Sequence, residues 1–180
     1  MALRDTDQGE DDGYTEYVTA KAPWLRKIAF LLCQDWHRAD DLTQTTIIKL
    51  YNHWRRAREA GNMDGYARAI LVKTFISEQR THWWSRVSLF NSHAGGSEDM
   101  AAEQLGAALE RDLDLGLDLQ TALAAIPPRQ RAVIVLRYYC DLSVDDTAAV
   151  LLCSPGTVKS QTWHGLAALR RQLTPDHASL

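Results

Sequence analysis

Apolar residues recur at helical spacing along most of this 180-residue chain, and this periodicity limits the fold more than any other feature. Trp24, Ile28 and Leu31 share one helical face, and the spacing recurs between Leu42 and Trp54. The chain shows no regular alternation of strand and helix patterns, which a parallel sheet would require. The sequence therefore predicts an all-α fold.

Breaks in the periodicity divide the chain into two small helical domains. The residues between them include Gly95-Gly96 and are rich in small polar and acidic types, which is typical of a flexible linker. The first residues are short, polar and acidic and predict a disordered tail. The expected order is an acidic tail, an N-terminal helical domain, a flexible acidic linker, a C-terminal helical domain and a second tail, over residues 1–13, 14–86, 87–116, 117–173 and 174–180.

Charge is segregated along the chain, so the net charge of −3 hides two basic modules. Residues 55–86 carry seven Lys and Arg against three acids, and residues 126–173 carry six against three. Residues 87–120 reverse this balance, with seven acids against one Arg. Clustered positive charge within folded modules is typical of nucleic-acid binding.

Several functional classes lack their sequence signatures. No stretch approaches the roughly 20 apolar residues of a membrane span, and the N-terminus lacks a secretory pattern, so we expect a cytoplasmic protein without membrane insertion. Cys33, Cys140 and Cys153 have neither disulfide nor zinc spacing and are expected to be free thiols. With no nucleophile–base pair, metal cluster or phosphate-binding glycine loop, we expect no enzyme activity, metal or cofactor.

Two helix-start signals in the second domain predict a helix-turn-helix. Ser143 has the outline of an N-cap, and Ser154-Pro155 places a cap before a proline that suits the first helical position. The resulting helices, at 143–152 and 155–172, are joined by about three residues. The second helix of such a unit enters the DNA major groove. Its base-facing surface is expected to comprise Pro155, Gly156, Thr157, Lys159, Ser160 and Gln161.

The amino-acid sequences of both domains resemble those of bacterial sigma factors. In the second domain, the stretch from Leu123 to Val133 and the stretch from Ser154 to Ser160 resemble the family's fourth conserved region. In the first domain, the run from Ala39 to Gln44 looks like the second region. Having these two regions with a short linker is similar to the extracytoplasmic-function (ECF) group of alternative sigma factors.

The resemblance implies partners and site residues. It implies binding to the β′ and β subunits of core RNA polymerase, recognition of promoter DNA at −35 and −10, and an inhibitory anti-sigma factor. Core docking would involve Asp40, Asp41, Leu42, Gln44 and Thr45. Contact with the opened −10 element would involve Lys73, Arg80, Trp83, Trp84 and Arg86, because cations and aromatic faces bind phosphates and unstacked bases. The −35 element would meet the helix surface named above, extended to His164.

Simpler interpretations stay open for individual residues. Asp40 and Asp41 suit the front of a helix, and Trp83 or Trp84 could pack in a core. Leu152 stands where the family usually has a glycine, so the turn there must avoid or tolerate a left-handed residue.

Two other functions are compatible with the pattern. A stand-alone helix-turn-helix regulator would bind duplex DNA as a dimer without polymerase. A helical adaptor that binds only protein would show weak DNA binding that does not depend on salt.

Overall fold

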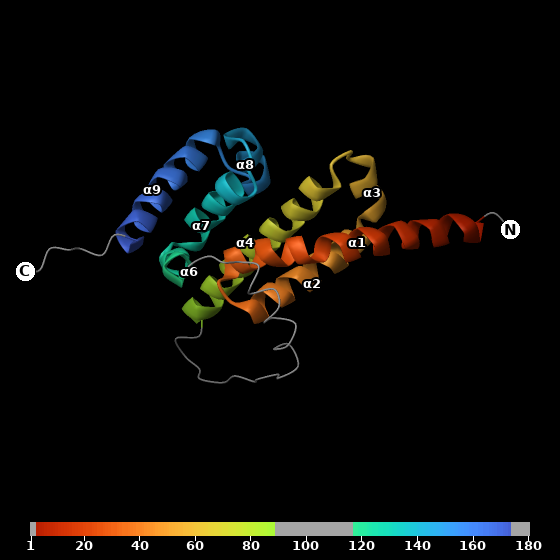
Figure 1. Ribbon diagram of the computed structural model, residues 1–180, viewed down its shortest axis with the longest axis horizontal. Helices are drawn as coiled ribbons and strands as arrows, with labels where there is room; N and C mark the ends of the chain where they lie inside the picture. The colour runs from red at the N-terminus through yellow and green to blue at the C-terminus, as the bar shows by residue number, and fades with distance from the viewer. Residues whose placement is uncertain (1–2, 89–116, 174–180) are drawn as a thin grey trace, which may run out of the picture.

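The described part of the chain is helical and confirms the expected all-α class. The computed structural model describes the backbone of residues 3–88 and 117–173, and side-chain environments for 12–79 and 119–173. Figure 1 shows the helices in two groups, with α8 and α9 at the end opposite the N-terminal part of α1. The elements are α1 (Leu3–Cys33), α2 (Trp36–Asn52), α3 (Trp54–Glu59), α4 (Met63–Ser88), α6 (Leu117–Ala125), α7 (Pro128–Ile134), the π-helical η1 (Val135–Tyr139), α8 (Val144–Leu151) and α9 (Pro155–Leu173).

The N-terminal module is built from α1, α2 and α4, which contact one another, while the short α3 connects α2 to α4. Its buried core includes Leu25 and Ile28 of α1, Leu50 of α2, and Leu71 and Phe75 of α4. Asp35 caps α2 by accepting a hydrogen bond of 2.8 Å from the Arg38 backbone N–H. Asp40 and Asp41 therefore lie one turn inside α2, where they cannot cap it.

The first residues differ from the expected disordered tail, because α1 already begins at Leu3. Tyr14 donates a hydrogen bond of 2.9 Å to the Ile47 carbonyl, and its ring meets the Trp54 ring edge-on at 5.3 Å. Once this segment is held on the module, extending the helix toward the N-terminus adds a backbone hydrogen bond per residue without a new nucleus. Acidic side chains near a helix N-terminus also favour its dipole. From Leu3 onward the backbone is thus helical where a disordered tail was expected.

The C-terminal module contains the expected helix-turn-helix. Val133 of α7, Ala148 of α8 and Val158 of α9 form its inner contact. Ahead of them, the buried Arg131 donates a hydrogen bond of 3.1 Å to the Leu123 carbonyl near the end of α6. The short α7 passes directly into the π-helical η1.

The two modules pack against each other, with α1 and α4 in contact with α7, η1 and α8. One apolar cluster runs from Leu25 and Phe75 to Leu136 without interruption. We call this contact the module seam and define it by Cys33 of the N-terminal module and Arg131, Leu136 and Cys140 of the C-terminal module. The expected linker, 87–116, lies outside the described backbone except for its first two residues, which end α4.

Burial at the module seam shifts the pKa values of two thiols and one guanidinium. It raises the pKa of the Cys33 thiol to about 11, so this thiol stays protonated at neutral pH. Burial also lowers the pKa of the Arg131 guanidinium. The pKa of Cys140 is raised by burial, although Arg68 of α4 hydrogen-bonds to it across the seam and opposes the rise.

The turn between α8 and α9 tolerates a left-handed leucine. Leu152 has φ 52° and ψ 49°, and 78% of it is exposed. A left-handed conformation costs an L-residue about 1–2 kcal/mol, and a glycine regains most of this despite its greater unfolded-state entropy.

We therefore expect Leu152→Gly to stabilise the protein by about 1 kcal/mol and to raise Tm by roughly 2–4 °C. Equilibrium urea unfolding and calorimetry measure both quantities. Leu152→Ala is the matched control, because it removes the exposed side chain and keeps the strained backbone. An equal gain from the alanine variant would contradict the backbone explanation.

Candidate functional site

Serine caps fix the two helices of the helix-turn-helix. Ser143 Oγ accepts a hydrogen bond of 3.0 Å from the Asp146 backbone N–H and so begins α8. Ser154 Oγ accepts one of 3.1 Å from the Thr157 backbone N–H and begins α9, with Pro155 at the first helical position. The start of α9 is thus set by local chemistry that the sequence predicts.

The close approach of α9 to α7 decides which face of α9 is exposed. Val158 is fully buried, and a Cβ added to the buried Gly165 would lie 2.7 Å from Ile134 Cδ1. Packing this face inward turns the opposite face to solvent. The predicted DNA-facing residues are accordingly exposed, apart from the half-buried Gln161: Pro155, Gly156, Thr157, Lys159, Ser160 and His164.

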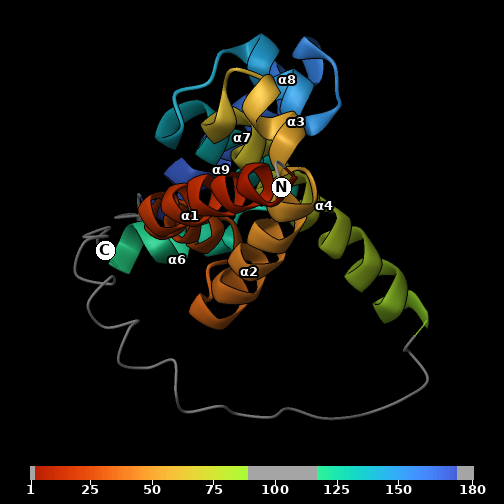
Figure 2. The same ribbon diagram turned by 90° about the vertical axis from the view of Figure 1, so that its right-hand side faces the viewer.

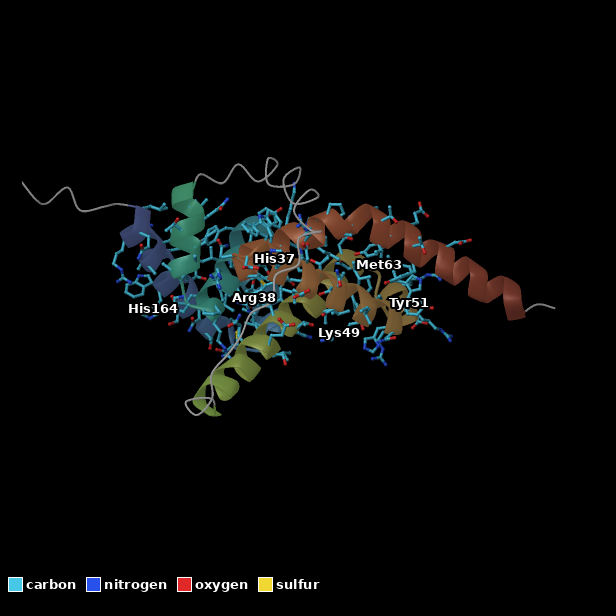
Figure 3. All side chains as sticks on the ribbon, turned by 90° about the horizontal axis from the view of Figure 1, so that it is seen from below. His37, Arg38, Lys49, Tyr51, Met63 and His164 are labelled. Atoms are coloured by element: carbon cyan, nitrogen blue, oxygen red, sulfur yellow. The ribbon has the colours of Figure 1, made fainter. Side chains whose placement is uncertain are left out.

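Trp163 is a surface residue of α9 that the sequence reasoning missed. It is 68% exposed, and its ring meets the His164 ring edge-on with centroids 4.8 Å apart. Figure 3 labels His164 on α9, far from the residues labelled on α2. Trp163 follows Lys159 by four positions and so lies on the same side of the helix. The sequence did hold a signal for this exposed position. Trp163 is a large apolar residue one turn beyond Lys159, on a face whose residues lack the spacing of a buried core.

Asp40 forms a structural ion pair. Its carboxylate accepts from Arg26 Nε and, at 3.0 Å, from Arg26 Nη2. Arg26 is only 8% exposed, and its guanidinium lies over the Trp36 ring at 4.3 Å from the centroid. The structure therefore commits Asp40 to joining α1 and α2, which removes most of its value as a contact for a partner.

The outer face of α2 carries a different apolar residue from the one in the predicted docking set. Asp41 and Gln44 are exposed and Thr45 is half-buried, as a contact surface requires. Leu42 is 1% exposed and belongs to the core, so it offers no contact surface in this structure. Ile48, seven residues after Asp41 and 63% exposed, supplies an apolar surface on this face instead.

The candidate −10 residues lie on α4. Lys73 is exposed, and next to it the buried Thr74 accepts a hydrogen bond of 3.0 Å from Lys49 of α2. Figures 2 and 3 show the C-terminal half of α4 projecting away from the other helices. The backbone of this half is helical through Ser88. The other four candidates are on it, but their side chains lie outside the described set: Arg80, Trp83, Trp84 and Arg86.

The described residues offer neither a metal site nor a membrane span. Within them, no three His, Cys, Asp or Glu side chains gather closely enough to hold a metal ion. Among the described helices, none is both long and apolar enough to cross a bilayer. Cys33, Cys140 and Cys153 are free cysteines.

Comparison with known proteins identifies both modules. Residues 17–85 match the family model for sigma-70 region 2, and residues 116–169 match that for sigma-70 region 4. The chain is 33% identical to the RNA polymerase sigma-E factor of Streptomyces coelicolor, over 92% of this chain and 88% of that protein. It is 30% identical to the ECF RNA polymerase sigma factor SigL of Mycobacterium tuberculosis, over 83% and 82% of the two chains.

A solved structure has a similar arrangement of both modules. It is the sigma factor RpoE of Bartonella quintana in a complex with the anti-sigma factor NepR. The match has a TM-score of 0.68 at 25% sequence identity, and it covers 92% of this chain and 99% of that one.

The contrast between Asp40 and Asp41 can be measured directly. Asp40→Asn leaves the Arg26 guanidinium buried without its charge partner, and we expect a loss of about 2 kcal/mol in the free energy of unfolding, reduced from the usual 3–5 because Asp40 is partly exposed. Asp41→Asn is the matched control on the same helix and should change stability by less than about 0.5 kcal/mol. Equal effects in chemical denaturation would refute the structural assignment of Asp40.

Proposed function

We propose a residue-level function for this chain, which belongs to the sigma-70 family and, within it, to the ECF group of sigma factors. It is a sigma factor that directs transcription initiation. Its proposed partners are core RNA polymerase and promoter DNA, in the cytoplasm where polymerase acts. We infer that it supplies specificity and leaves the chemistry of RNA synthesis to polymerase.

The exposed face of α9 is the single observation that best supports −35 recognition. Lys159 can donate to guanine O6 and N7 or to a phosphate, and the amide of Gln161 can pair with an adenine edge. Ser160 and Trp163 add a hydroxyl and an apolar ring on the same side, and such a ring can pack on a thymine methyl group. We assign −35 reading to this face, with Trp163 added to the residues that the sequence suggested.

The projecting half of α4 supports a role in holding the opened −10 strand. Its Trp83 and Trp84 supply aromatic faces and its Arg80 and Arg86 supply cations. A base leaving the duplex loses stacking worth a few kcal/mol, and each base stacked on an aromatic ring regains roughly 1–3 kcal/mol. Lys73 lies farther back on the same helix, where its exposed ammonium can meet a phosphate.

Docking on core polymerase is assigned to the outer face of α2. Asp41, Gln44 and Thr45 supply the polar part of the contact, and Ile48 supplies the apolar anchor. A small apolar side chain at the centre of a polar face is the usual composition of an interface that forms and separates. Asp40 positions this helix through Arg26 and does not itself bind the partner.

Binding both promoter elements requires the modules to part. The −35 and −10 elements are centred about 25 base pairs apart, which at about 3.4 Å per pair is roughly 85 Å. Modules that pack directly against each other cannot span that distance. We infer that the module seam opens in the polymerase complex. An anti-sigma factor is the proposed partner of the packed form, because the similar Bartonella structure has one bound.

Run-off transcription tests the function as a whole. Purified core polymerase on sheared genomic DNA should give discrete new transcripts only when this protein is present. Lys159→Ala should weaken the transcripts that depend on a −35 element by roughly tenfold, which corresponds to about 1.4 kcal/mol of lost binding free energy. Absence of transcripts, together with DNA binding by the protein alone as a dimer, would favour the stand-alone regulator instead. Absence of both would favour the protein-binding adaptor.

The apolar anchor on α2 gives a second test. Ile48→Ser should weaken binding to core polymerase roughly tenfold, because loss of a central apolar contact typically costs more than 1 kcal/mol. Fluorescence titration of labelled protein with core polymerase, in the absence of DNA, measures this affinity. Asp145→Asn, an exposed change on α8, is the control. Unchanged affinity for Ile48→Ser would move the docking surface away from this face.

A further inference from the structure

A positively charged side chain crosses the module seam without a charged partner. Arg68 of α4 is half-buried, and its guanidinium donates a hydrogen bond to the Cys140 sulfur at the end of η1. Its Nε is buried and has no hydrogen-bond partner among the described residues. The Arg68 Cζ also lies 6.0 Å from the centroid of the Trp24 ring, but Trp24 belongs to the same module and stays with Arg68 when the modules part. The seam thus takes part of a cation out of water.

The surroundings of Arg68 return little for this lost hydration. Asp64, one turn earlier on α4, is engaged by Lys21 at 2.6 Å and by the Tyr17 hydroxyl at 3.0 Å. Among the described residues, no Asp or Glu forms an ion pair with Arg68. Burial raises the pKa of the Cys140 thiol, so the sulfur that Arg68 meets is neutral at neutral pH. A neutral thiol is a weak acceptor, and a charged donor gains little from it.

A second guanidinium reaches the seam from the other module with a similar deficit. Arg131 of α7 is 7% exposed, and its Nη1 donates at 3.1 Å to the Leu123 carbonyl within its own module. Its Nε is buried without a partner in the described part of the chain. Burial lowers the pKa of this guanidinium, because the packed surroundings disfavour its charge. Each module therefore brings to the seam a cation that packing leaves incompletely bonded.

We propose that Arg68 is a release element of the module seam: its poorly partnered guanidinium offsets part of the apolar burial and keeps the packed form of the free chain marginally stable. A buried charge without a matched partner costs stability, and an apolar side chain of similar size in its place is often more stable. Apolar burial at Leu136 closes the seam, and Arg68 limits how firmly it closes. This inference rests on the proposed function, in which the parted form binds polymerase and DNA.

Cys33 is a natural reporter of seam opening. It is only 7% exposed, and burial raises its pKa to about 11, so it reacts poorly with alkylating agents while the seam is closed. Iodoacetamide is added to the full free chain, and peptide mass spectrometry follows the modification of Cys33. When the seam opens and closes faster than the thiol is alkylated, the rate at Cys33 is proportional to the parted population.

Two single substitutions should both close the seam more firmly. Arg68→Met keeps a long side chain and removes the charge, and we expect alkylation of Cys33 to slow roughly tenfold. Cys140→Asp keeps the cation and gives it a carboxylate acceptor across the seam, with a similar expected slowing. Cys140→Asn supplies a neutral oxygen and should slow the reaction less. It also serves as the milder variant if the aspartate disturbs folding.

The double variant Arg68→Met/Cys140→Asp should reverse the effect. It leaves the new carboxylate at the seam without its cation, so alkylation of Cys33 should be faster than in wild type. The two single changes are thus expected to be non-additive, because they act on one contact. Both single variants should also bind core polymerase more weakly by up to tenfold, although the proposed contact surfaces on α2, α4 and α9 are unchanged.

Two controls separate seam opening from other effects. Arg129→Met makes the same chemical change at an exposed arginine of α7 and should leave the rate at Cys33 unchanged. Cys153 packs on the inner contact of the helix-turn-helix, so its alkylation in the same samples reports unfolding of the C-terminal module itself. The rate at Cys153 should be the same in every variant.

The outcomes distinguish this inference from the proposed function. Slower alkylation of Cys33 in both single variants, with faster alkylation in the double variant, supports it. An unchanged or faster rate for Arg68→Met overturns it, since Arg68 would then not oppose closure. Parallel changes at Cys153 also overturn it and assign the effect to module unfolding. Failure of wild type to direct transcription counts against the proposed function, and alkylation of the free chain still decides the role of Arg68.

Discussion

The structure depends on an apolar core that neither module completes alone. Burial is a smaller fraction of the total surface in small domains. Among the described residues, the inner contact of the helix-turn-helix is small: Val133, Ala148 and Val158 are buried, and Val144, Leu151 and Cys153 pack against them. Across the module seam, Leu136 joins the core of the N-terminal module. Separating the modules therefore exposes apolar surface. The packed form is stable because both modules share this burial.

This dependence links stability to partner choice. A partner that binds the parted form has to offset the exposed seam with its own contacts, and a partner that binds the packed form does not. Polymerase and DNA together are expected to provide these compensating contacts through α2, α4 and α9, whose proposed contact surfaces lie outside the seam. An inhibitor that binds the packed form leaves the seam buried and has no such cost to offset. Modest contacts would therefore suffice for it to compete with polymerase.

The sequence predicted best what local chemistry decides. The start of α8 at Ser143 and the start of α9 at Ser154-Pro155 both follow from a serine cap, and the structure has each at the expected place. It failed where distant residues decide. Asp40 was taken for a surface acid because the buried Arg26 lies fourteen positions earlier, and nothing in the local pattern announces that pairing.

Helical faces were predictable only in part, for a related reason. Leu42 and Ile48 are both apolar residues of α2, and their spacing alone does not show which of them turns to the core. Contacts with α1 and α4 decide this, and they bury Leu42 while exposing Ile48. The same applies to Trp163, whose exposure follows from the tight approach of Gly165 to Ile134 on the other side of α9. Periodicity therefore predicts that a segment is helical, and tertiary packing decides which face of the helix is buried.

The distribution of positive charge also explains why promoter binding must involve more than α9. Between Pro155 and Gly165, Lys159 is the sole Lys or Arg, so the recognition helix supplies shape and hydrogen bonds with little electrostatic attraction. DNA affinity depends largely on neutralised phosphates, and a chain with a net charge of −3 gains none from its overall field. The attraction has to come from local concentrations of cations. The N-terminal module holds these, since residues 55–86 carry seven Lys and Arg against three acids. A division between reading at α9 and holding at the N-terminal module therefore follows from the placement of charge.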